Sequence, residues 1–215
     1  MLNPTTLGNF TLNLACVLYL FVYIPQIRYN NTKHHLAELS VSLHMILMTS
    51  FVLDLMYGYL QSLPWQYLLV SWVALSTLSI QHIQIVRLSQ QNRYILLYYM
   101  LNIFYLSLLL ILVGFFCFKN ILYSNHIIGL MGGVSRVGFL SYTLPQIIQN
   151  HRFHSAKALD TTFLTLSLLL ALLDLTSAWC LDWGWPNKLG EPFSMLFILV
   201  LLWQKKSNVF NKQLI

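Results

Sequence analysis

Long apolar runs separated by short polar segments set the pattern of this chain of 215 residues. An α-helix needs about 20 mostly apolar residues to cross the roughly 30 Å of hydrocarbon in a bilayer. On that scale the sequence predicts seven spans and therefore an all-α membrane protein. They are Phe10–Ile27, two spans within Leu39–Val86 that turn at Pro64-Trp65, Tyr94–Phe118, Tyr123–Gln149, Leu159–Cys180 and Leu189–Gln204.

Lys and Arg between the spans predict the orientation, because cytosolic loops carry an excess of these residues. Alternate connections and the C-terminal tail place nine of them on one face and two on the other. The nine are Arg28, Lys33, Arg87, Arg93, Arg152, Lys157, Lys205, Lys206 and Lys212, against Lys119 and Lys188. The N-terminus is therefore expected outside or in a lumen, and the C-terminus in the cytosol.

The composition argues against most other classes of protein. Hydrophobic residues make up 57% of the chain and charged residues 8%, against roughly 45–50% and about 25% in soluble domains. The formal charge of +6 lies between the spans rather than in a basic stripe, so we expect no nucleic-acid partner. No metal-type Cys/His spacing or Gly-rich phosphate loop predicts a metal or a cofactor. No nucleophile and base stand at a catalytic spacing, so we expect no enzyme.

An internal repeat appears when the sequence is shifted by 120 residues against itself. Eleven of the 46 positions from Leu20 to Trp65 are identical to their counterparts. Leucine pairs arise by chance in such spans, but coincident Pro, Gln, Asn, Asp and Trp do not. The informative pairs are Pro25 with Pro145, Gln26 with Gln146, Asn30 with Asn150, Asp54 with Asp174 and Trp65 with Trp185.

Each copy of the repeat holds three predicted spans, and the fourth span stands between the copies. An odd inserted helix restores the orientation of the second copy, so we expect two parallel three-helix bundles around an axis along the membrane normal. This 3+1+3 arrangement divides the chain into a first repeat (9–93), a linker helix (94–120), a second repeat (121–205) and a cytosolic tail (206–215). A path for a solute is expected along the axis between the copies.

The sequence around each Pro-Gln pair resembles the signature of PQ-loop proteins. It reads PQIRYNNTKHHLAELS in Pro25–Ser40 and PQIIQNHRFHSAKALD in Pro145–Asp160. The resemblance implies a seven-span fold shared with the lysosomal cystine and cationic amino-acid exporters and, more distantly, with the SWEET sugar carriers and the KDEL receptor. Where the cystine exporters carry an acidic or amide residue, this chain has Leu47 and Ser167, so their substrate and proton site does not transfer.

Pro25 and Pro145 each lie inside a predicted span, where proline removes one backbone hydrogen bond and kinks the helix. Two interpretations fit the repeated Pro-Gln pair. In the first, Gln26 and Gln146 bond the carbonyls that proline leaves without a partner, and the pair is structural. In the second, which the resemblance implies, the Pro-Gln pairs are hinges with which an inner gate opens.

Asp54, Asp174 and Arg136 are predicted at similar depths in spans two, six and five. A charged side chain that faces lipid costs on the order of 3 kcal/mol on insertion scales, so these three are expected to face the interior. One reading is a structural ion pair in which Arg136 holds a carboxylate. Because one Arg cannot neutralise two carboxylates, the other reading makes the remaining Asp a site of substrate or proton coupling, and either Asp fits that role.

Polar and aromatic residues in or beside the spans are candidates for lining a cavity between the copies. The alternative is that they pack or bond a neighbouring helix, where a hydrogen bond contributes roughly 0.6 kcal/mol. The candidates are Tyr23, Asn30, His44, Asn102, Tyr142 and Asn150.

The spans, the repeat and the internal charges together predict a transporter that moves a small polar solute across a lipid bilayer by alternating access. Coupling to protons is a further expectation. An amino acid or a derivative is the first solute class, because it carries both charges and the interior carries Arg and Asp. Two alternatives stay open: a sugar carrier of the SWEET type, and a receptor or scaffold of the KDEL-receptor type that does not transport.

Overall fold

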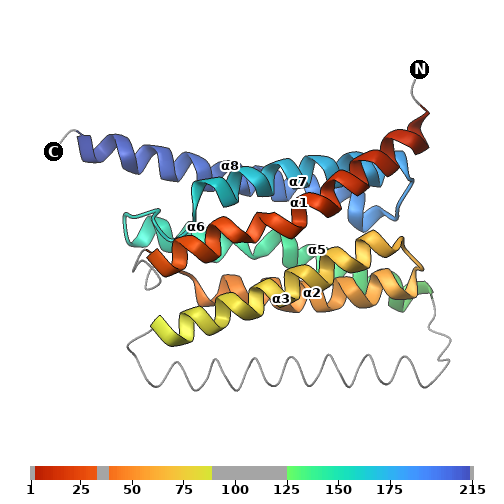
Figure 1. Cartoon of the computed structure of the whole chain (residues 1–215), viewed down its shortest axis with the longest axis horizontal. Helices are drawn as coiled ribbons and strands as arrows, with labels where there is room; N and C mark the ends of the chain where they lie inside the picture. Colours follow the sequence, from red (N-terminus) through yellow and green to blue (C-terminus); the bar gives the residue numbers. More distant parts are fainter. Residues whose placement is uncertain (1–2, 33–38, 89–124, 214–215) are drawn as a thin grey trace.

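The computed structural model describes residues 3–32, 39–88 and 125–213, and the regular elements in these ranges are α-helices (Figure 1). They are α1 (Pro4–Thr32), α2 (Val41–Leu60), α3 (Trp65–Leu88), α5 (Asn125–Ser141), α6 (Thr143–Arg152), α7 (Thr161–Cys180) and α8 (Trp185–Gln213). The predicted fourth span and Asn102 lie outside the described residues. The 3+1+3 arrangement and its boundaries therefore stay a prediction.

Four of the described helices are long and apolar enough to cross a membrane: Pro4–Thr32, Ser42–Leu60, Trp65–Ile85 and Thr161–Cys180. The turn at Pro64 between α2 and α3 lies where the sequence predicts it. The last helix differs from its prediction. α8 begins at Trp185 rather than Leu189 and continues to Gln213, so most of the expected tail is helical.

The helical segments that contain Pro25 and Pro145 differ in continuity. α1 passes through Pro25 as one helix, which bends along its length in Figure 1. The second copy is divided at Tyr142 into α5 and α6, three residues before Pro145. A proline ring crowds the carbonyl four residues earlier and offers no N–H, which accounts for a break beside Ser141. The kink that the sequence predicts in the fifth span therefore takes the form of a break between two helical segments.

The repeat recurs in the backbone at the offset of 120 residues. Ser40 caps the N-terminus of α2 and Asp160 caps that of α7, and each accepts a hydrogen bond from the N–H three residues later. The hairpins that follow each contain a residue at φ 51°, Ser62 in the first and Asp182 in the second. This left-handed conformation is uncommon outside glycine. The two copies therefore share both their caps and their turns.

The two copies pack crosswise. α1 packs most extensively on α7 and α2 on α5, so the first helix of each copy lies against the second helix of the other. α3 and α8 each pack on the two other helices of their own copy. A Cβ on Gly138 would overlap Ser50 of α2, which shows how closely α5 and α2 approach. The centre of the molecule is thus an interface between the copies.

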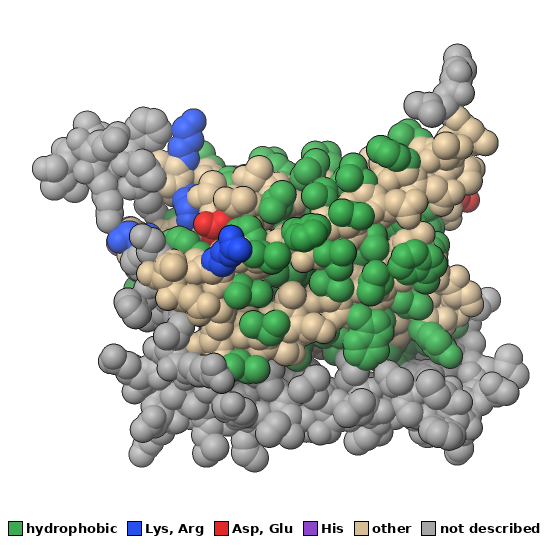
Figure 2. Space-filling view, viewed as in Figure 1, with side chains coloured by type: hydrophobic (Ala, Val, Ile, Leu, Met, Phe, Trp, Pro, Cys, Tyr) green, Lys and Arg blue, Asp and Glu red, His purple; other side chains and the backbone are tan. Residues whose placement is uncertain are grey.

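The two ends of the bundle differ in charge. We call the end with the Pro-Gln motifs the Pro-Gln end and the end with the two hairpins, at the right in Figure 1, the hairpin end. Figure 2 shows apolar side chains across the middle of the visible face and Lys and Arg side chains near the Pro-Gln end. The described basic residues at that end are Arg28, Arg152, Lys157, Lys205 and Lys206, whereas Lys188 lies at the hairpin end. The asymmetry is the one on which the predicted orientation depends.

Candidate functional site

A cavity of about 110 Å³ lies between the two copies, with room for several water molecules. Residues of α1, α2, α3, α5, α7 and α8 line it, so neither copy forms the cavity alone. Its polar wall consists of Tyr19, Tyr23, Asp54, Tyr67, Arg136, Tyr142, Ser167, Asp174, Asn187, Glu191 and Ser194. The wall therefore contains all three charged residues that the sequence analysis placed in the interior.

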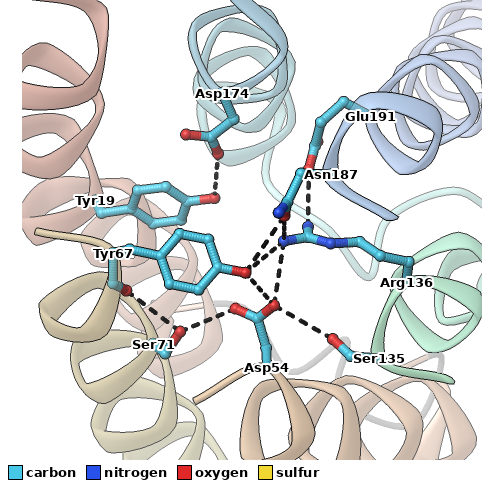
Figure 3. Close-up of polar contacts among 9 residues, drawn as sticks. All are labelled: Tyr19, Asp54, Tyr67, Ser71, Ser135, Arg136, Asp174, Asn187 and Glu191. Carbon is cyan, nitrogen blue, oxygen red and sulfur yellow. Dashed lines mark hydrogen bonds and ion pairs between the residues drawn. The ribbon is translucent and has the colours of Figure 1, made fainter. Parts of the chain in front are cut away.

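Asp54 is at the centre of a hydrogen-bond network that joins four helices (Figure 3). Its Oδ1 accepts hydrogen bonds from Tyr67 Oη at 2.5 Å and from Arg136 Nη2 at 3.1 Å. Ser71 donates to Oδ2 at 3.0 Å, and Ser135 donates to Oδ1 at 3.4 Å. The Asp54 side chain is 7% exposed. A carboxylate so enclosed is stabilised by its partners and held in one geometry.

Arg136 holds a second carboxylate, which the sequence analysis missed. Its Nη1 donates to Glu191 Oε1 at 3.0 Å, and the two side chains are 11% and 13% exposed. The sequence analysis singled out Asp54, Asp174 and Arg136 but not Glu191, which lies near the start of the predicted seventh span. Because α8 begins at Trp185, Glu191 lies in its second turn, where it reaches Arg136. The 120-residue shift offered a signal, since it pairs Glu191 with Ser71, a partner of Asp54.

Asp174 has the same place in the second copy as Asp54 in the first but a different environment. Its Oδ2 accepts a hydrogen bond from Tyr19 Oη at 2.9 Å. In Figure 3 its carboxylate is joined to Tyr19 and to none of the other labelled side chains. Among the described residues it forms no salt bridge, and its side chain is partly exposed.

A narrower pocket of about 20 Å³ adjoins the cavity toward the Pro-Gln end. Tyr23, Tyr142 and Phe163 line both spaces, so aromatic rings stand where they meet. The rings of Tyr23 and Phe163 have centroids 5.9 Å apart. His44 lines the narrower pocket, with Nε2 3.1 Å from Oε1 of Gln81. Tyr23, Tyr142 and His44 therefore lie where the sequence analysis expected lining residues.

The Pro-Gln motifs join the two copies at the far side of this pocket. Gln26 Oε1 accepts a hydrogen bond from the Asp160 N–H at 2.7 Å, and its Nε2 donates to the Ala158 carbonyl at 3.1 Å. Gln146 Oε1 accepts from the Ser40 N–H at 2.9 Å. These bonds reach across to the opposite copy, whereas the structural interpretation placed the glutamines on carbonyls of their own bent helices.

Residues 7–67 match the family model of the PQ loop repeat. The matched range contains α2, most of α1 and the hairpin after α2, and it includes Pro25, Gln26 and Asp54. The match shows that this segment is similar to one PQ loop repeat, and it covers less than a third of the chain. No curated protein matches the chain. The apolar helices of membrane-spanning length indicate an integral membrane protein.

The second copy reproduces the bonds of the matched PQ-loop repeat. Gln26 Nε2 donates to Asn30 Oδ1, and Gln146 Nε2 donates to Asn150 Oδ1, both at 2.8 Å. Each Asn then donates to a glutamine of the third helix in its own copy, Asn30 to Gln84 and Asn150 to Gln204. Neither Asn is among the residues that line the two pockets, and both form the bonds to a neighbouring helix that the sequence analysis gave as the alternative.

Two buried donors in the cavity wall have no hydrogen-bond partner among the residues that the structure describes. They are Asn187 Nδ2 and Arg136 Nε. Asn187 is 2% exposed, and its Oδ1 accepts from both Arg136 Nη2 and Tyr67 Oη. A buried donor without a partner costs about 1–3 kcal/mol, so such groups call for a bound water or ligand. The second copy therefore brings to the wall two donors without a described partner, and Asp174 brings a carboxylate that pairs with none of the described cations.

Proposed function

We propose that this protein is a transporter that carries a small polar solute by alternating access through the cavity between its two copies. The observation that carries the proposal is the charged wall, to which both copies contribute. Ionisable groups within a membrane are costly and mark the paths of solutes or ions. The aromatic rings and the crossed Gln26 and Gln146 bonds separate this cavity from the Pro-Gln end, where an inner gate is needed.

An amino acid or a derivative is the solute class that suits this wall best. Its carboxylate can accept hydrogen bonds from Asn187 Nδ2 and Arg136 Nε, the two donors of the cavity wall that have no partner among the described residues. Its ammonium group can neutralise a carboxylate in the same cavity. A sugar offers only hydroxyl groups and leaves the charges of the wall uncompensated, which disfavours the SWEET-type alternative.

The prolines act as hinges in this proposal. Opening the Pro-Gln end must separate α1 from the loop before α7 and α6 from the loop before α2, because Gln26 and Gln146 join these segments. The bend of α1 and the break at Tyr142 lie next to those bonds. We expect Pro25→Ala and Pro145→Ala each to slow transport in liposomes at least several-fold. Unchanged initial rates in both variants would contradict the hinge.

Liposomes that contain the purified protein test the transport itself. After loading with an unlabelled amino acid, they should take up the labelled amino acid by saturable counterflow, and empty liposomes should not. Saturable binding to the detergent-solubilised protein without counterflow would instead identify a receptor of the KDEL-receptor type. Counterflow of sugars alone would support the SWEET-type carrier.

A further inference from the structure

We propose that Asp174 is the cation site of the cavity, where the protonated amine of the solute and a proton replace one another. The proposal rests on the transport function above and adds the class of solute, a small primary amine with or without a carboxylate. It also assigns different roles to the two repeated aspartates. Asp54 is a structural anchor, and Asp174 is the carboxylate that changes partners.

The surroundings of the two aspartates carry this assignment. Asp54 is bonded by Tyr67, Ser71, Ser135 and Arg136, and rearranging it would break four hydrogen bonds in a buried network. From the residues that the structure describes, Asp174 accepts one bond, which comes from a tyrosine hydroxyl. A tyrosine hydroxyl can donate to a carboxylate or accept from a carboxylic acid, so this contact persists in both protonation states. Equivalent positions of the two copies thus hold a carboxylate fixed by four hydrogen bonds, Asp54, and a carboxylate that can change its protonation state and its partner, Asp174.

The net charge of the wall indicates which kind of ligand the cavity would bind. Among the residues that line the cavity, Arg136 is the one cation, and it faces the three carboxylates Asp54, Glu191 and Asp174. Arg136 is paired with the first two. With all four groups ionised the wall carries a net charge of −2. Uncompensated charge in a space of low dielectric constant is costly, so a cation or a proton must accompany Asp174.

Ionisable groups from five other helices, and one between α5 and α6, line the cavity together with Asp174 of α7. They are Tyr19 and Tyr23 on α1, Asp54 on α2, Tyr67 on α3, Arg136 on α5, Tyr142 between α5 and α6, and Glu191 on α8. The tyrosine hydroxyls are neutral donors, and the two other carboxylates already share the guanidinium group. Asp174 is therefore the group in this wall whose charge a ligand can change without breaking an ion pair.

The exchange step follows from this competition. When an ammonium group reaches a protonated Asp174, the proton leaves for the solvent on the side to which the cavity is open, and the ammonium pairs with the carboxylate. After the cavity opens to the opposite side, the amine leaves there, and a proton from the solvent on that opposite side binds to Asp174 in its place. One amine that moves in one direction is thus exchanged for one proton in the other, so the exchange moves no net charge when the solute carries a single positive charge, as lysine does.

Ligand-dependent thermal unfolding of the detergent-solubilised full chain tests the assignment directly. The probes are putrescine, lysine, leucine, succinate and glucose, each titrated at pH 6 and pH 8. We expect putrescine, lysine and leucine to stabilise the protein, and succinate and glucose to have no effect. The apparent Kd for amines should rise as the pH falls, by at most about tenfold per pH unit, because protons compete for the same carboxylate.

Asp174→Asn is the decisive variant, and Asp182→Asn is its matched control. Asparagine keeps a hydrogen-bonding group for Tyr19 but has no charge, so amine binding should weaken at least tenfold and lose its pH dependence. Asp182 lies in the hairpin before α8 and not in the cavity wall, so its variant should bind amines as the wild type does. Amine binding by Asp174→Asn that equals the wild type would overturn the proposal.

The two proposals fail separately. Amine binding that depends on Asp174 without any counterflow would refute transport and leave the cation site intact. Counterflow of neutral solutes with no binding of amines would refute the cation site and leave transport intact. If Asp174→Asn does not fold, the wild-type protein still decides. Wild-type amine affinity equal at pH 6 and pH 8, together with no proton release into a pH-sensitive dye on uptake of putrescine, would contradict the exchange.

Discussion

Replacing Gln26 by leucine removes bonds between the copies while keeping a side chain of similar size. Gln26 makes two bonds to the second copy, one with the Asp160 N–H at 2.7 Å and one with the Ala158 carbonyl at 3.1 Å. A hydrogen bond contributes about 0.5–1.5 kcal/mol net, so the two contribute about 1–3 kcal/mol to the closed Pro-Gln end. The equilibrium between closed and open forms should then shift toward open by roughly 5- to 150-fold.

Labelling of a buried cysteine measures that shift. In a chain with Cys16, Cys117 and Cys180 replaced by alanine, Thr143→Cys places a thiol in the narrower pocket, where Thr143 is 2% exposed. A membrane-impermeant thiol reagent applied at the Pro-Gln end reaches it only in the open form. While the open form is rare, the labelling rate is proportional to its population. We therefore expect the rate to rise roughly 5- to 150-fold with Gln26→Leu.

Gln84→Leu is the matched control for this experiment. Gln84 bonds Asn30, Asn31 and the Ile27 carbonyl, all within the first copy, so its loss weakens that copy while both bonds from Gln26 to the second copy stay in place. The labelling rate of Thr143→Cys should change less than twofold in this variant. Equal rates in the Gln26→Leu and Gln84→Leu variants would refute the role of the crossed bonds.

Three further substitutions test the packing by thermal or denaturant unfolding in detergent. Arg136→Met leaves two buried carboxylates without a cation and should lower the free energy of unfolding by about 3–5 kcal/mol. Adding Asp54→Asn should restore part of this loss. No loss in Arg136→Met would show that the ion pairs are not buried. Gly138→Ala should cost about 1–3 kcal/mol, because the new methyl group overlaps Ser50, and Ser50→Ala should restore most of it. Ser62→Gly should raise stability by up to about 1 kcal/mol, since Ser62 is left-handed at φ 51°, and a decrease would contradict that conformation.

Much of the fold follows from local pattern. Uncharged runs define the helices, and Pro64 defines the first hairpin, because both depend on residues adjacent in sequence. The 120-residue register predicts more, since residues that share a register share an environment in a duplicated fold. It therefore placed Asp54 and Asp174 at one level, in agreement with their common cavity wall.

The parts that the sequence did not predict depend on contacts between distant segments. The partners of Gln26 and Gln146 lie in the opposite copy, and no spacing within one motif indicates the crosswise packing that brings them together. Proline predicts a kink in both copies, but α1 continues through Pro25 whereas the second copy breaks at Tyr142, so the residue alone does not predict the form of the kink. Glu191 was missed because the seventh span was predicted to begin at Leu189, which left this residue at its edge.

Access to the cavity from both ends is the most direct test of the central claim that the two copies enclose a path through the membrane. Ser167 lines both pockets and suits a cysteine reporter in the chain without native cysteines. With Ser167→Cys in liposomes, an impermeant thiol reagent should label the thiol from either side, and a saturating solute should change both rates. Labelling from one side alone, at every solute concentration, would mean a blind cavity and would contradict the account.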